Sequence, residues 1–253
     1  MLKLQEKLVL IQPADSLYVI SKSLADHIDR YTFSFLMCPT LPSYVGKLVT
    51  NLVLDILEKN PASGWPVDIG HSKAKMDIIK TRVQTKLTER RNQMKAIILA
   101  SLGVAAAGDT STETTAMQPR AGSTTIVNLC ENLVGIYKGV ALKVTIQMCS
   151  RVAVLRDVAI SSGNIKSGSF WPAVDKELQS VRDAYPLDPK KRSRIFAKNL
   201  TNDRRLFGQA DLDALHDVNG SVAQQEAEQV VNGTAVLLFA SPADMSAVAS
   251  DDE

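Results

Sequence analysis

Hydrophobic residues recur along much of this chain at the three- and four-residue spacing of an α-helix. The clearest stripe places seven apolar side chains on one face: Val45, Leu48, Val49, Leu52, Val53, Ile56 and Leu57. Asn60 and Pro61 are expected to end this helix, and Ser43 is the candidate N-cap. An earlier helix is expected over about residues 14–30.

A second stripe begins near Ser72, after a loop that is rich in turn-forming residues. Its apolar positions are Met76, Ile79, Val83, Leu87, Met94, Ile97 and Ile98. Arg90 stands where the next apolar residue would be expected. The pattern predicts a long helix whose apolar face is interrupted by one arginine.

Residues 126–158 carry the widest apolar arc, about 160° around a helix. One row alternates by four and three: Ile126, Cys130, Leu133, Tyr137, Val140 and Val144. This pattern predicts one long helix at the centre of a bundle, and it also permits a coiled coil. A partner helix would contact Ile126, Leu133, Tyr137, Val140 and Val144.

Residues 170–208 form a compact basic unit in which three helices are expected. Asp188 and Pro189 are a typical N-cap and first helical residue, and the helix that follows is expected to end near Leu200. A third short turn would then stop at Gly208. Such a unit is typical of small helix-turn-helix modules and equally of helical hairpins that bind nothing.

These patterns predict an all-α protein of about seven helices, because no strand pattern of convincing length occurs. The expected organisation is an N-terminal helical region (1–107), a flexible linker (108–123), a second helical region (124–208) and a mostly disordered acidic tail (209–253). A short helix is possible within the tail at about 221–230.

Charge divides the chain sharply. Residues 1–208 hold all 29 Lys and Arg with 18 of the 27 acids, a net of +11, whereas residues 209–253 hold nine acids and no Lys or Arg. Such a division suggests a basic body with an acidic tail.

Two segments concentrate the basic residues, and both are candidates for contacting phosphates. The candidates are Lys73, Lys80, Arg82, Lys86, Arg90, Arg91 and Lys95 in the first, and Lys190, Lys191, Arg192, Arg194, Lys198, Arg204 and Arg205 in the second. In the first segment the basic residues flank the apolar stripe, as side chains that snorkel from a buried face do. In the second, Lys191-Arg192-x-Arg194 matches the core of a nuclear import signal.

Motifs for enzymatic chemistry are absent from the sequence. No phosphate-binding glycine loop, nucleophile elbow or zinc-protease helix occurs, and the three histidines have no partner at metal-ligand spacing. The three cysteines lie in apolar surroundings, which favours free thiols in a reducing compartment. We therefore expect no catalytic residue, no metal or other cofactor, no small-molecule ligand and no membrane segment.

The sequence thus predicts a non-enzymatic nuclear protein that contacts nucleic acid through its basic helices, largely without regard to base sequence. The alternative is a helical scaffold or assembly protein, nuclear or cytoplasmic, that oligomerises or binds a partner helix through residues 126–158.

Overall fold

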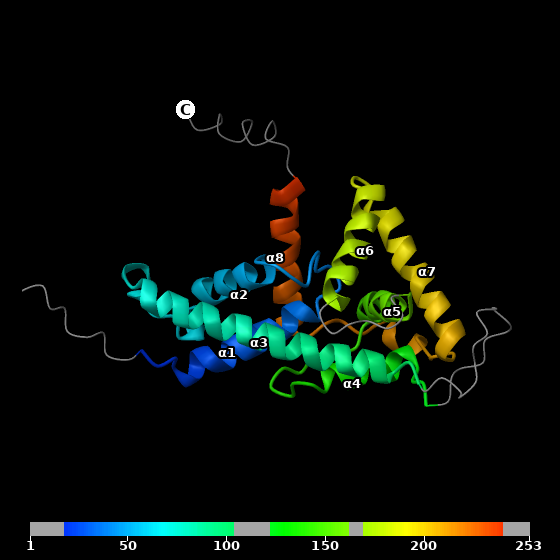
Figure 1. Cartoon of the computed structure of the whole chain (residues 1–253), viewed down its shortest axis with the longest axis horizontal. Helices are drawn as coiled ribbons and strands as arrows, with labels where there is room; N and C mark the ends of the chain where they lie inside the picture. Colours follow the sequence, from blue (N-terminus) through cyan, green and yellow to red (C-terminus); the bar gives the residue numbers. More distant parts are fainter. Residues whose placement is uncertain (1–17, 104–121, 162–168, 240–253) are drawn as a thin grey trace, which may run out of the picture.

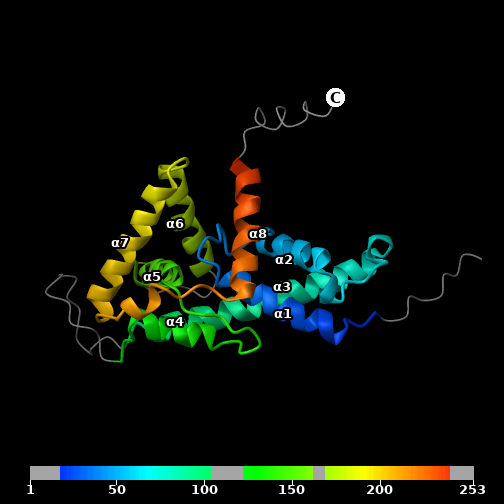
Figure 2. The same cartoon turned by 180° about the vertical axis from the view of Figure 1, so that it is seen from behind.

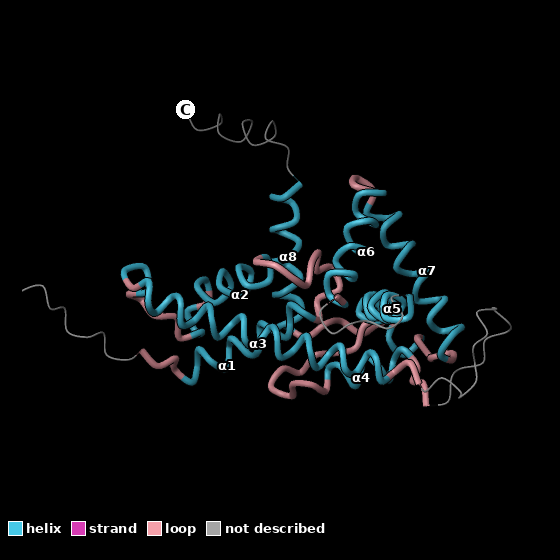
Figure 3. Tube along the Cα trace, in the orientation of Figure 1, coloured by secondary structure: helices cyan, strands magenta, loops and turns pink. Residues whose placement is uncertain are grey.

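Helices account for all the regular structure in the described part of the chain. The computed structural model describes residues 18–103, 122–161 and 169–239. It contains eight α-helices and three short 3-10 turns in these ranges, and no strand (Figure 3). The all-α prediction is therefore confirmed. Most of the expected linker, and residues 240–253 of the acidic tail, lie outside the described residues.

The eight helices share one core, and six of them form two groups on either side of it. Their bounds are α1 (Lys22–Leu36), α2 (Leu48–Lys59), α3 (Lys73–Ala100), α4 (Ile126–Val134), α5 (Ile146–Ser161), α6 (Phe170–Ala184), α7 (Pro189–Phe207) and α8 (Val222–Phe239). Figure 1 shows α1, α2 and α3 on one side, and α6 and α7 flanking α5 on the other. One continuous cluster of buried apolar side chains includes residues from all eight helices.

Polar side chains cap several helices: Asp188 is a predicted cap, and Ser72 caps the helix that the sequence predicts to start near it. The hydroxyl of Ser72 accepts a hydrogen bond from the backbone N–H of Lys75 at 3.3 Å, and Asp188 accepts one from Lys191 at 2.9 Å. Two expected boundaries are wrong. The first helix spans Lys22–Leu36 rather than 14–30, and α2 follows Lys47 instead of Ser43.

The expected long helix over residues 126–158 is wrong, because the structure has two helices there. α4 ends at Val134, and α5 begins at Ile146 with Thr145 accepting the backbone N–H of Met148 at 3.2 Å. Between them the ring of Tyr137 folds over Gly139, where an added Cβ would lie 2.4 Å from the ring. A side chain at position 139 would therefore displace the Tyr137 ring from its place over the turn.

The break expected near Leu200 is also wrong, since α7 runs without interruption to Phe207. Leu200 is buried in the middle of the helix, and the hydroxyl of Thr201 donates to the carbonyl of Ala197 within it. Gly208, predicted to stop a separate short turn, instead ends α7 with φ of 104°.

The first part of the acidic segment is folded onto the body. α8 packs against α1 and α2, and Glu226 accepts a hydrogen bond from the Tyr31 hydroxyl at 3.2 Å. Gln224 exchanges hydrogen bonds with the backbone of Lys143, at 2.8 and 2.9 Å. α8 is longer than the helix expected at 221–230, and Val231, just beyond that range, is buried in the core.

α5 is the central helix of the second group and is buried on nearly every side. In Figures 1 and 2 it is seen end-on between α6 and α7. Besides apolar residues it buries two cations, Arg151 and Arg156. Its most extensive packing is against α7.

A buried ion pair ties α5 to α7. Nε of Arg156 lies 3.3 Å from Oδ2 of Asp203, with exposed side-chain fractions of 0% and 4%. Arg156 also donates to the carbonyl of Thr124 at 2.9 Å and lies over the ring of Phe207. Desolvation outweighs the attraction of Arg156 and raises the pKa of Asp203 to about 6.

This shift makes the stability of the protein depend on pH. Because the pKa of Asp203 in the folded chain lies above its ordinary value of 3.8, its contribution is fully present below that value and is lost as the pH rises through about 6. The Asp203→Asn variant has no such titration. Urea unfolding should therefore give a wild-type free energy of unfolding that, relative to the variant, is smaller at pH 7 than at pH 4. A difference that does not change with pH would contradict the raised pKa of Asp203.

Candidate nucleic-acid interface

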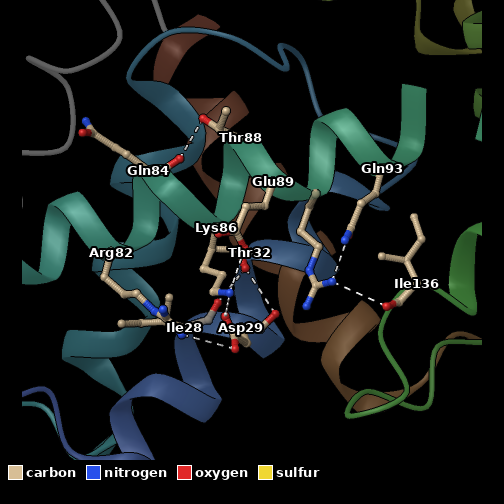
Figure 4. Close-up of polar contacts among 11 residues, drawn as sticks. Ile28, Asp29, Thr32, Arg82, Gln84, Lys86, Thr88, Glu89, Gln93 and Ile136 are labelled. Atoms are coloured by element: carbon tan, nitrogen blue, oxygen red, sulfur yellow. Dashed lines mark hydrogen bonds and ion pairs between the residues drawn. The ribbon is translucent and has the colours of Figure 1, made fainter. Parts of the chain in front are cut away.

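Basic residues in the middle of α3 are neutralised by neighbouring acids. Arg82 and Lys86 both reach Asp29 of α1, at 3.7 and 3.9 Å, and Lys86 also pairs with Glu89 at 2.8 Å. Figure 4 shows these side chains converging on Asp29 from α3. Their charge therefore joins α3 to α1, which leaves little attraction for an external phosphate.

Arg90 is buried, so it is unavailable to a nucleic acid. Its guanidinium lies 4.8 Å from the ring centre of Tyr137 and 5.8 Å from that of Phe33. It donates to Gln93 at 3.0 Å and to the carbonyl of Ile136 at 3.4 Å. The arginine that interrupts the apolar stripe of α3 thus holds the turn after α4 against α1.

Arg91 belongs to a set of arginines that bind the loop over residues 37–47. It donates to the carbonyl of Tyr44 at 2.8 Å. Arg151 donates to the carbonyls of Pro39 and Leu41, at 2.7 and 3.0 Å, and Arg182 to that of Pro42 at 2.7 Å. Three helices therefore fix this loop through its carbonyl oxygens.

Asp175 of α6 fixes the other side of the same loop. Its carboxylate accepts hydrogen bonds from the Ser43 hydroxyl at 2.7 Å and from the backbone N–H groups of Tyr44 and Val45 at 2.6 and 2.9 Å. Tyr44 stacks on Trp171, and burial raises the pKa of Tyr44 to about 12. Ser43, expected to cap α2, instead joins the two groups of helices.

The remaining α3 candidates do not make a continuous basic surface. Lys73 is exposed at the first position of the helix, Lys80 is half-buried, and Lys95 lies 5.9 Å from the ring centre of Phe170. Most of the charge in the first basic segment therefore serves the fold.

The second basic segment has a different character, because α7 exposes a row of cations on its outer face. Lys190, Lys191, Arg194, Lys198 and Arg205 are all exposed, and at 100° per residue they lie within an arc of about 100°. The opposite face is buried and includes Leu200, Asp203 and Phe207. From Lys191 to Arg205 the row is about 21 Å long. We call these five residues the α7 basic row.

Acidic residues are nearly absent from α7 itself. Asp203 is the helix's one acid, and it is buried against Arg156. At the start of the helix, Lys191 lies 3.6 Å from Asp188 in a solvent-exposed pair, which is worth little. Arg192 and Arg204 are half-buried and lie off the row, with Arg204 donating to the carbonyl of Ala210.

The two basic segments do not form one surface. Figures 1 and 2 show the first turn of α7 at the top of the molecule, next to the end of α6, whereas α3 runs along the lower part. Of the two groups of candidates, only the α7 basic row offers aligned, exposed cations.

The candidate partner-helix residues line the interior instead of a free face. Ile126 and Leu133 of α4 are fully buried and Val140 is 6% exposed, while Tyr137 and Val144 are half-buried and packed against the same core. The apolar arc therefore packs against the protein's own helices, as expected for the centre of a bundle.

A cavity of about 390 Å³ next to α7 is a site that the sequence analysis missed. Its lining comes from the 37–47 loop and from four helices, α5 to α8. Arg151, Arg182 and Arg192 line it, and no acidic residue does so among the described residues. A broader groove of about 1070 Å³ between α2 and α8 carries mixed charge, with Asp55, Lys59 and Glu226 in its lining.

The described residues contain neither a metal-binding cluster nor a membrane-spanning helix. No three His, Cys, Asp or Glu side chains gather there in a way that would hold a metal ion. Nor does any helix in the described ranges combine the length and the apolar character that crossing a bilayer requires. Cys38, Cys130 and Cys149 are buried free thiols.

Comparisons with known proteins identify no relative. No protein-family model matches this chain, and no curated protein or solved structure is detectably similar to it.

The contacts of Asp175 with the 37–47 loop should stabilise the folded protein. The Asp175→Ala variant leaves the N–H groups of Tyr44 and Val45 without their acceptor, so the free energy of unfolding in urea should fall by about 1–3 kcal/mol. Asp183→Ala on the same helix is the control. Asp183 is exposed and bonds only its neighbour Gln179, so its loss should change stability by less than about 0.5 kcal/mol. Equal effects would contradict the joining role of Asp175.

Proposed function

We propose that this protein is a non-enzymatic nucleic-acid-binding protein whose contact surface is the α7 basic row. The observation that carries the proposal is the alignment of five exposed cations on one helical face, with the helix's single acid turned inward. A row about 21 Å long matches several successive phosphates of a nucleic-acid strand.

The chemistry of the row favours binding without sequence preference. Its exposed neighbours on α7 are small residues, Ser193, Ala197 and Thr201, which offer little to read base edges. The one ring recorded against the row in the described residues is that of Tyr185, just before α7, 5.7 Å from Lys191. Lysine and arginine contacts to phosphates position a protein on nucleic acid and do not discriminate bases.

The nuclear location rests on the same segment. Lys191 and Arg194 of the import-like motif are exposed on the first turns of α7, and Arg192 is half-buried. These two exposed cations are therefore the ones available to an import receptor, and replacing them should reduce nuclear accumulation.

Charge removal from the row tests the proposal directly. Replacing Lys191, Arg194 and Lys198 with Gln should weaken binding of a fluorescent 20-base-pair duplex and lower the slope of log affinity against log salt by about 0.9 per lost phosphate contact, measured by anisotropy. The matched control replaces three exposed lysines elsewhere, Lys22, Lys47 and Lys59, with Gln. This control makes the same change in net charge.

Two results would contradict the proposal. One is equal weakening by the two triple variants, which would indicate a general effect of net charge. The other is no binding of DNA or RNA by the unmodified protein at low salt, where the electrostatic attraction is largest.

The acidic end of the chain should oppose binding. Truncation after Phe239 removes four acids, Asp244, Asp251, Asp252 and Glu253, and leaves all the described helices in place. Because these acids repel phosphates and can compete for the row, the truncated protein should bind the same duplex more tightly, most clearly at low salt. Unchanged affinity at low salt would show that the acidic end does not act on this surface.

A further inference from the structure

The cavity beside α7 is lined by three arginines, and none of its lining residues is an acid. Arg151, Arg182 and Arg192 come from α5, α6 and α7 respectively. None of the three forms an ion pair with a described residue. The nearby carboxylate of Asp175 is already engaged by Ser43 and two backbone N–H groups.

Arg151 is the most unusual of the three, because it is a buried cation without a counter-ion. Its side chain donates from Nε and Nη2 to the carbonyls of Pro39 and Leu41, and Phe196 lies over the guanidinium at 5.1 Å. Nη1 is buried and has no hydrogen-bond partner among the described residues. A buried charge of this kind costs stability unless something pairs with it.

Mutual repulsion adds to this cost. Burial lowers the pKa of Arg182 and the positive charge of Arg151 lowers it further, while Asp175 and Asp183 act in the opposite direction and Arg192 adds a smaller lowering. Burial also lowers the pKa of Arg151. An anion placed between the three guanidinium groups would remove both the repulsion and the missing pairing.

The rest of the lining indicates what else the ligand carries. One wall is apolar, with Leu178, Val181 and Phe196, and polar groups are supplied by Gln147, Ser150 and Ser193. The volume of about 390 Å³ lies in the range of small-molecule sites and far exceeds that of a lone phosphate. A ligand that fills it must bring an apolar part as well as an anionic one.

We propose that the cavity between α5, α6 and α7 binds a small phosphorylated molecule, with its phosphate held by Arg151, Arg182 and Arg192 and its apolar part against Phe196 and Leu178. Planar guanidinium groups match phosphate oxygens with paired hydrogen bonds, and a dianion uses more than one of them. This site is separate from the α7 basic row and does not depend on nucleic-acid binding.

Phenyl phosphate is a suitable probe, and isothermal titration calorimetry of the full chain is the measurement. We expect it to bind with a dissociation constant below about 1 mM. Inorganic phosphate should bind more weakly because it leaves the apolar wall empty, and phenol should not bind measurably. Absence of phenyl phosphate binding at low ionic strength would overturn the proposal, and equal affinity for the two phosphates would contradict the role of the apolar wall.

Arg192→Met is the sharpest variant, because the half-buried Arg192 side chain forms no hydrogen bond, ion pair or ring contact with the described residues. Losing one charge-assisted hydrogen bond should weaken phenyl phosphate binding about tenfold or more. Arg194→Met is the matched control: it removes the same charge two residues along the same helix, on the outer face. Equal affinities of these two variants would overturn the placement of the ligand.

A second pair of variants keeps the test decisive if Arg192→Met is poorly folded. Ser193 is exposed and also lines the cavity, so Ser193→Glu places a carboxylate beside the arginines, while Ser193→Gln adds similar bulk without charge. The Glu variant should lose phenyl phosphate binding and the Gln variant should keep most of it. Retained binding in both would contradict the proposal.

Discussion

Burial of two arginines on α5 is the constraint on which the rest of this structure depends. α5 is enclosed by its neighbours, so each of its cations must find partners inside the protein. Arg156 does so with Asp203 of α7 and the carbonyl of Thr124, which fixes α7 and the segment before α4. Arg151 does so with two carbonyls of the 37–47 loop, which joins the first group of helices to the second.

The same constraint explains how the positive charge of the chain is distributed. Cations of α3 hold α1 and a nearby loop. Lys86 pairs with Asp29 of α1, and Arg91 donates to the carbonyl of Tyr44. Charge around α5 surrounds a cavity that lacks acids. Within the described ranges, the cations on the outer face of α7 form no ion pair or hydrogen bond with another helix, and for this reason we propose that face for nucleic-acid binding. Basic composition alone would not have separated these three uses.

Local signals in the sequence predicted the helical class, a helix start near Ser72, the start of α7 at Asp188 and a helical stop at Gly208, since these depend on spacing and on neighbouring residues. They placed the end of α7 too early, near Leu200. The division between α4 and α5 was missed because the apolar spacing continues through the turn between them. In that turn the ring of Tyr137 lies over Gly139. The arginine cavity was missed because its three arginines are distant in sequence. One signal was present: Arg151 and Arg156 stand within the apolar run of 146–160, where a cation needs a partner.

Most cations of α3 contact other parts of the protein. We propose that the exposed cations of α7 bind phosphates instead. Backbone amide chemical shifts of the full chain, followed by NMR during titration with a short DNA duplex, test it most directly. Shift changes should concentrate in residues 190–205 and disappear at high salt, with residues 73–95 largely unchanged. Changes concentrated in residues 73–95, with α7 unaffected, would contradict the claim.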